Sequence, residues 1–280
     1  PGHPATLLIH PDTAYNILTD PVTTSSKATD INVERSSEGG HEVLTVTGKI
    51  SSDLPEKHIY KNVTEPALYA GYNLKSFLRQ RGIEFTGKVI KGKTPSDAKL
   101  LSEVVSWRLY DIITDMNKFS NNFVAEMLAK DMAAELTGKQ GTMDLAVDKI
   151  REFLHNEVGL EKNQFQLNNV SGFTRKNEFT ARQFVEVLTW AHDQFTLAPE
   201  FIQSLPVAGV DGTLEKRFKG MSGERKIRAK TGLLNGVVAL SGFAGRRRGE
   251  EIVFSFIFNG GENEARVRDI FDGLASQLTK

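Results

Sequence analysis

The chain has 280 residues, of which 39% are hydrophobic and 25% are charged, a composition typical of globular proteins with one large or two smaller domains. Lys plus Arg equal Asp plus Glu at 35 each, so no global positive field exists to attract nucleic acid or an anionic membrane. The absence of cysteine excludes disulfides, thiolate catalysis and cysteine-ligated metal sites. No apolar run comes near the roughly 20 residues that span a bilayer, so the sequence predicts no transmembrane segment.

Strand signals dominate the first third of the chain. Four segments are rich in β-branched residues, show some alternation of side-chain type and are bounded by Gly, Pro, Ser or Asp. These features predict strands over residues 5–9, 31–34, 43–50 and 84–90. A helical spacing of apolar residues predicts one helix over residues 66–81, which Gly82 ends. A turn-rich connector follows over residues 91–97. We therefore expect a β-rich accessory region over residues 1–95, which orients substrate and supplies no catalytic side chain.

After the connector the apolar period changes from two to about 3.6 residues. Apolar residues between 101 and 116 form one helical stripe, and a second begins at Phe123. Residues 117–122 between them, with three Asn and a Ser, predict a tight corner with an N-cap. Further helices are expected over residues 143–155 and 180–194, the latter with a capping box from Thr180 to Gln183.

The last third predicts an antiparallel meander and a closing helix. Strands are expected over residues 226–233, 237–243 and 252–258, and an amphipathic helix over residues 264–278. Arg246, Arg247 and Arg248 stand beside glycines between two apolar runs and are interpreted as an exposed hairpin tip. Residues 96–280 thus predict an α+β domain in which helices precede a sheet that a last helix covers.

Two short motifs carry chemistry, and they lie about 110 residues apart. Ser120 and Asn122 form a Ser-x-Asn element at the helix corner, where a hydroxyl can relay a proton and an amide can bind a substrate carbonyl. Lys230, Thr231 and Gly232 form a Lys-Thr-Gly element on a strand, where an ammonium and a hydroxyl can bind a carboxylate and glycine leaves room for a peptide. We expect Ser120, Asn122 and Lys230 to meet in one cleft between the helices and the sheet.

Plainer interpretations of the same residues stand beside these. Ser120 and Asn122 can act as caps for the helix near Phe123, and Thr231 and Gly232 as strand and turn. Lys118 is interpreted as structural, and Asp211, flanked by glycines, as a turn former or N-cap. The six histidines, at positions 3, 10, 41, 58, 155 and 192, show no zinc-peptidase spacing.

The longer text around the motifs resembles the class C low-molecular-mass penicillin-binding proteins, the D-alanyl-D-alanine carboxypeptidase/endopeptidase family. The resemblance covers nearly the whole chain. Its matching stretches are residues 116–126, 171–175 with 177 and 180–182, 205–214 with 217–218, 228–232 and 240–243.

The resemblance implies a penicillin-binding/serine β-lactamase-like transpeptidase fold and a periplasmic serine peptidase without cofactor or metal. Such an enzyme cleaves D-Ala-D-Ala stem peptides or crosslinks of peptidoglycan through an acyl-enzyme and binds β-lactam antibiotics. It implies catalytic roles for Ser120, Asn122 and Lys230. It also implies substrate-binding roles for Thr231, Gly232 and Leu233, whose backbone N–H would form half of the oxyanion hole.

The chain departs from the family pattern in its nucleophile. The one Ser-x-x-Lys match, Ser96 to Lys99, lies in the polar connector and is interpreted as a chance match. We therefore expect the nucleophile on an N-terminal segment or chain that partners this one. Residues 168–172 also stand where the family tends to carry Asp-Gly-Ser-Gly, and Leu233 where Thr is common.

Two other functions are left open by the residues. The first is a non-catalytic module that binds peptidoglycan or a partner protein through the same groove. The second is a β-lactamase, which is disfavoured because the sequence offers no convincing base for deacylation.

Overall fold

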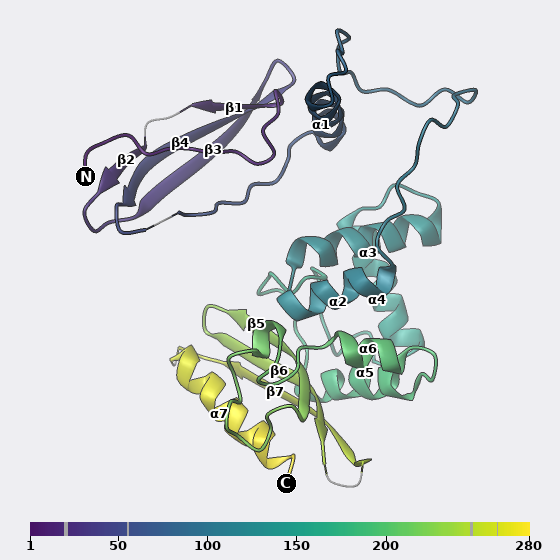
Figure 1. The fold of residues 1–280 in the computed structure, drawn as a ribbon. Helices are drawn as coiled ribbons and strands as arrows, with labels where there is room; N and C mark the ends of the chain where they lie inside the picture. Colours follow the sequence, from purple (N-terminus) through teal and green to yellow (C-terminus); the bar gives the residue numbers. More distant parts are fainter. Residues whose placement is uncertain (20–21, 55, 247–248, 262) are drawn as a thin grey trace. The chain divides into compact units, whose positions relative to one another are not determined.

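The computed structural model describes residues 1–19, 22–54, 56–246, 249–261 and 263–280. The chain divides into two compact units, residues 1–103 and residues 104–280 (Figure 1). Of the predicted arginine hairpin tip, Arg247 and Arg248 lie outside the described residues.

The first unit contains a small mixed sheet and one helix. Its strands are β1 (Asn16–Thr19), β2 (Val22–Ser25), β3 (Asp30–Glu38) and β4 (His41–Ser51), and its helix is α1 (Pro66–Gln80). β4 pairs in parallel with β1 and β2 and antiparallel with β3. The predicted strands over 31–34 and 43–50 and the helix over 66–81 are confirmed.

Two strand predictions in this unit are wrong. Residues 5–9 and 84–90 form no strand, although Ala5 donates one backbone hydrogen bond to Val22. Both segments have β-rich composition, but a strand persists only where neighbouring strands satisfy its backbone groups along its length. Composition alone did not reveal that such neighbours are missing among the described residues.

The second unit begins with helices. They are α2 (Leu109–Phe119), α3 (Asn122–Thr137), α4 (Met143–Asn156), α5 (Ala181–Asp193), α6 (Ala198–Ser204) and a short 3₁₀ helix, η1 (Gly212–Leu214). The capping box of α5 is present as predicted, with Thr180 and Gln183 exchanging hydrogen bonds. No described helix has the length and apolar character that crossing a membrane demands.

The predicted helix over residues 101–116 is partly wrong, because α2 begins only at Leu109. The preceding residues form neither helix nor strand, and Leu101 and Val104 are 96% and 95% exposed. Apolar residues at helical spacing stabilise a helix mainly when one face packs against a partner. No described residues bury these side chains, so the spacing alone does not form a helix here.

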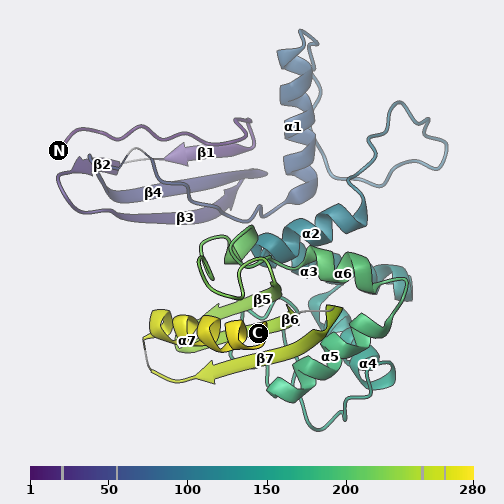
Figure 2. The same cartoon turned by 60° about the horizontal axis from the view of Figure 1, so that its bottom comes forward.

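The sheet of the second unit is an antiparallel meander in the order β5–β6–β7, as predicted. Its strands are β5 (Ile227–Leu234), β6 (Val237–Gly245) and β7 (Glu251–Asn259), and α7 (Glu264–Gln277) follows them. Figures 1 and 2 show α7 lying along one face of this sheet.

Alternation along the strands separates the two faces of the sheet. Ala229, Leu240 and Phe254 pack in the buried cluster that contains Phe271 of α7. Phe243, at the opposite parity on β6, packs instead with Leu188 of α5. Because side chains alternate between faces, Lys230 lies on the face opposite α7, toward the helices.

Candidate active site

The corner between α2 and α3 holds Ser120 in a left-handed conformation. Ser120 is the C-cap of α2, with φ 55° and ψ 49°, and its backbone N–H donates to the Met116 carbonyl. Non-glycine residues seldom adopt this conformation. The N-cap of α3 is Asn121, whose side chain accepts from the Val124 N–H. The interpretation of Ser120 and Asn122 as caps for the start of α3 is therefore wrong, because Asn121 performs that role. The Ser120 hydroxyl is not used to cap α3.

The structure brings Ser120 and Lys230 into contact. The Lys230 Nζ donates to the Ser120 Oγ at 2.6 Å, across a sequence separation of 110 residues. The same ammonium donates to the Thr231 carbonyl at 2.9 Å. A helix corner and a strand of the adjoining sheet thus bring Ser120 and Lys230 together, as predicted. The third predicted member, Asn122, forms no hydrogen bond with either side chain among the described residues.

Burial changes the acid–base chemistry of Lys230. Removal of the side chain from water disfavours the charged form and lowers the pKa of Lys230 to about 8. No described carboxylate forms an ion pair with its ammonium. Lys230 therefore exchanges protons readily near neutral pH and still offers a positive charge to an anionic ligand.

Lys118 and Asp211 tie the end of α2 to the loop before η1. The Lys118 Nζ donates to both carboxylate oxygens of Asp211, at 2.9 and 2.8 Å, and to the Leu205 carbonyl at 2.7 Å. Asp211 is the N-cap residue of η1, as predicted, although its side chain makes no capping hydrogen bond there. It does accept from the Val207 N–H at 2.8 Å, which agrees with a turn-forming role.

Beyond Ala229, the outer edge of β5 is unpaired among the described residues. Ile227 and Ala229 direct their backbone groups across this edge to residues 206–208. Because alternate residues of a strand direct their backbone groups to the same edge, Thr231 and Leu233 present theirs there too. Gly232 lies between them, and a Cβ at this position would come within 3.2 Å of the Ala239 Cβ.

The Thr231 hydroxyl contacts a second hydroxyl. The Thr231 Oγ1 donates to the Oγ1 of Thr213 in η1 at 2.9 Å. Thr213 belongs to no tripeptide element, so the motifs did not predict it. Its only sequence signal was its place within the matching stretch 205–214.

The other predicted residues are exposed. Asn122 is the first residue of α3, and its side chain makes no hydrogen bond to any described residue. Ser96 and Lys99 lie exposed in a segment without helix or strand, which is no setting for an activated nucleophile.

The loop at residues 168–172 is anchored to α3. Asn169 and Ser171 donate to the Glu126 carboxylate at 2.9 and 2.8 Å. The hydrogen bonds from Asn169 and then Ser171 lower the pKa of Glu126. Although this loop departs from Asp-Gly-Ser-Gly, side-chain hydrogen bonds to Glu126 hold it against α3.

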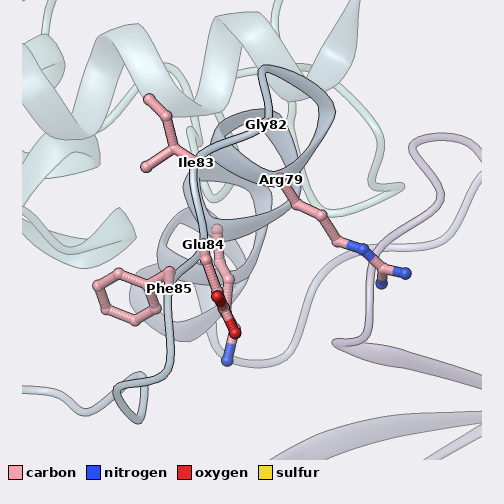
Figure 3. Close-up of a pocket in the computed structure, with 6 residues that line it drawn as sticks. Arg79, Gly82, Ile83, Glu84 and Phe85 are labelled. Atoms are coloured by element: carbon pink, nitrogen blue, oxygen red, sulfur yellow. The ribbon is translucent and has the colours of Figure 1, made fainter.

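A pocket in the first unit holds no comparable chemistry. It lies at the C-terminal end of α1 and is lined by Lys75, Arg79, Gly82, Ile83, Glu84 and Phe85 (Figure 3). The Lys75 ammonium lies 5.4 Å from the centroid of the Phe85 ring, a cation–π contact. None of these lining residues carries a hydroxyl or an imidazole, so this pocket offers no counterpart of the Ser120–Lys230 pair.

The whole chain, residues 1–280, matches the model of the D-Ala-D-Ala carboxypeptidase 3 (S13) family. The chain belongs to this family. A D-alanyl-D-alanine carboxypeptidase of Actinomadura sp. (strain R39) is 34% identical over 249 residues, which are 86% of this chain and 45% of that protein. The D-alanyl-D-alanine carboxypeptidase DacB of Haemophilus influenzae is 32% identical over 69% of this chain and 40% of its own length. The chain thus spans less than half the length of these relatives.

The fold comparison agrees with the family. Penicillin-binding protein 4 of Haemophilus influenzae, in a crystal structure complexed with a β-lactam, superposes with a TM-score of 0.71 and 25% identity. The match covers 89% of this chain and 59% of that one. The predicted α+β penicillin-binding fold and the predicted low-molecular-mass penicillin-binding protein family are both confirmed.

Proposed function

We propose that this chain supplies the Ser-x-Asn and Lys-Thr-Gly elements of a serine D-Ala-D-Ala peptidase. The observation that carries the proposal is the 2.6 Å hydrogen bond between Lys230 Nζ and Ser120 Oγ. The carboxypeptidase names of the relatives support the reaction class. The substrate is a peptidoglycan stem peptide in the periplasm. The enzyme acts on it as a carboxypeptidase or, where the peptide is part of a crosslink, as an endopeptidase.

In this proposal the Lys-Thr-Gly strand binds the substrate. The Lys230 ammonium and the Thr231 hydroxyl attract the terminal carboxylate of the D-Ala-D-Ala peptide. The peptide backbone adds to the free edge of β5, where Gly232 offers no obstructing side chain. The outward N–H of Leu233 donates to the oxygen of the scissile carbonyl as charge develops on it.

The reaction requires a serine that this chain does not supply. A serine in a Ser-x-x-Lys helix, on a segment outside these 280 residues, attacks the carbonyl carbon of the penultimate D-Ala and gives its hydroxyl proton to the neutral lysine of that motif. As the C–N bond breaks, Ser120 passes a proton to the leaving amine and is resupplied through Lys230. Asn122 donates its amide N–H to a substrate carbonyl. Water then hydrolyses the acyl ester and restores the serine.

Ser120 is less suited to be the nucleophile itself. The residue three positions later is Phe123 rather than a lysine, so no base follows on the next helical turn. Its partner Lys230 is also the residue that binds the substrate carboxylate in this scheme. Ser120 therefore relays protons rather than attacking.

Labelling with a fluorescent penicillin tests the proposal. We expect no covalent label on the 280-residue chain alone, and a label on the Ser-x-x-Lys serine when that segment is present. Ser120→Ala and Lys230→Ala should each slow acylation by about 10²-fold or more, the usual contribution of acid–base catalysis. Mass spectrometry of a tryptic digest locates the adduct.

The outcomes separate the alternatives. A penicilloyl adduct on the Ser120 or Ser96 peptide would contradict the assignment of an external nucleophile. Stem-peptide binding without any acylation, in the presence of the Ser-x-x-Lys segment, would favour the non-catalytic binding module.

A further inference from the structure

We propose that the Lys118–Asp211 ion pair is a positioning device that sets the separation between Ser120 on α2 and Lys230 on β5. This inference rests on the proposed function, in which the contact between Ser120 and Lys230 performs chemistry. Neither Lys118 nor Asp211 reaches the substrate in this scheme, and both act through the residues they hold.

Lys118 is bound more completely than an ordinary surface lysine. Its side chain is 12% exposed, and it lies two residues before Ser120. An ammonium has three N–H donors, and the three acceptors are the two Asp211 oxygens and the Leu205 carbonyl. All donors of Lys118 are therefore directed at the loop that precedes η1.

The same loop is bonded directly to β5. Ala208 donates its N–H to the Ile227 carbonyl at 2.9 Å, and Ala229 donates to the Pro206 carbonyl at 3.0 Å. Asp211 accepts from the N–H of Val207, which lies between those two loop residues. The contacts thus run from Lys118 through the loop to Ala229, one residue before Lys230.

These links close a ring whose last contact is the one between Ser120 and Lys230. The Lys118 end lies two residues from Ser120, and the Ala229 end lies one residue from Lys230. Gly212 adds a steric limit, because a Cβ there would lie 2.4 Å from the Lys118 carbonyl oxygen. The start of η1 therefore lies directly against the end of α2, and a loss of the ion pair releases one side of the ring.

The test measures how Lys230 titrates in the 280-residue chain by NMR of ¹³Cε-labelled lysine, with Lys230→Arg to assign its signal. If the ring opens, water reaches Lys230, so Lys118→Met and Asp211→Asn should each raise its pKa by about one unit toward the ordinary lysine value. Lys149→Met is the matched control, since it removes the Lys149–Glu152 pair on α4, with an Nζ–Oε2 distance of 2.7 Å. That control should leave the Lys230 titration unchanged.

A purely structural ion pair would give a different result. It would lower the midpoint of urea unfolding and leave the Lys230 titration of the folded protein where it was, and that result overturns the proposal. Asp211→Asn keeps an oxygen for the Val207 N–H, so it provides the answer if Lys118→Met does not fold. The Lys230 titration does not depend on acylation. A failure of the proposed peptidase activity is therefore distinguished from a failure of this inference.

Discussion

Ser120 combines a strained backbone with a functional hydroxyl. A left-handed conformation costs a non-glycine residue about 1–2 kcal/mol, and glycine is the usual residue at such a helix end. The hydroxyl, however, is what Lys230 contacts. The presence of serine at this corner is therefore explained by chemistry rather than by stability.

Substitutions of Ser120 separate the two contributions. Ser120→Gly and Ser120→Ala both lose the hydroxyl, but only glycine relieves the strain, so we expect the glycine variant to be more stable by about 1 kcal/mol. Urea unfolding followed by the fluorescence of Trp107 and Trp190, both in the second unit, measures the difference. An alanine variant at least as stable as the glycine variant would show that the strain is negligible.

Lys230 makes the stability of the second unit depend on pH. Its pKa of about 8 in the folded protein lies below the ordinary value of 10.5. Between these values the unfolded chain binds more protons than the folded one, so the free energy of unfolding contributed by this group rises with pH. Below about pH 8 the full cost of burying the charge is present, and above pH 10.5 it is absent.

Lys230→Met should remove that dependence. We expect the variant to be more stable than the parent at pH 7, and the gap between them to narrow from pH 8 to 10.5. Urea unfolding at several pH values gives the gap. Lys226→Met, at an exposed position next to β5, is the control and should show a constant difference. A constant gap for Lys230→Met would refute the burial argument.

Among the elements, the start of η1 fits closely against the end of α2. Gly212 has φ +56°, and a Cβ there would lie 2.4 Å from the Lys118 carbonyl oxygen. Gly220 has φ +75° with nothing within 4 Å of such a Cβ. The two glycines therefore share a left-handed backbone and differ in the space around them.

This pair isolates the steric term. Gly220→Ala should cost about 1 kcal/mol for its backbone conformation alone. Gly212→Ala should lower the free energy of unfolding by at least about 1 kcal/mol more, because α2 and η1 must also move apart. The measurement is again urea unfolding by tryptophan fluorescence. Equal losses of stability in the two variants would mean that η1 can move away from α2 without cost.

In the whole molecule, the segment between α1 and α2 contains the boundary between the two units. Residues 83–108 contain no helix or strand, and they include Lys88, Lys91, Lys93 and Lys99. Protease-sensitive sites concentrate in exposed segments of this kind. Brief trypsin digestion should therefore cut here first and leave a C-terminal fragment that begins between residues 89 and 109.

The fragment also tests the proposed division of labour, in which residues 1–95 supply no catalytic side chain. Mass spectrometry identifies the first cuts, and the isolated fragment should keep the Lys230 titration of the intact chain. First cuts within α2 to α7, or loss of the Lys230 signal from a folded fragment, would contradict it.

Elements with local signals could be predicted from the amino-acid sequence. Strand alternation and glycine turns located β5, β6 and β7, and the spacing from Thr180 to Gln183 located the start of α5. The motif order also predicted that Ser120 and Lys230 would meet, which the structure confirms. Periodicity and capping were predictable because they depend on neighbouring residues. The meeting of Ser120 and Lys230, which lie 110 residues apart, was predictable only from the pair of motifs.

Features that depend on distant partners became visible only in the folded chain. The apolar residues from Leu101 to Trp107 have the composition of a helix or strand, yet nothing described here packs on them, and they form neither. Lys118 and Asp211 are unremarkable in the sequence, and their 93-residue separation hides the ion pair. The depressed pKa of Lys230 likewise follows from burial, because desolvation depends on what surrounds a side chain rather than on its neighbours in the chain.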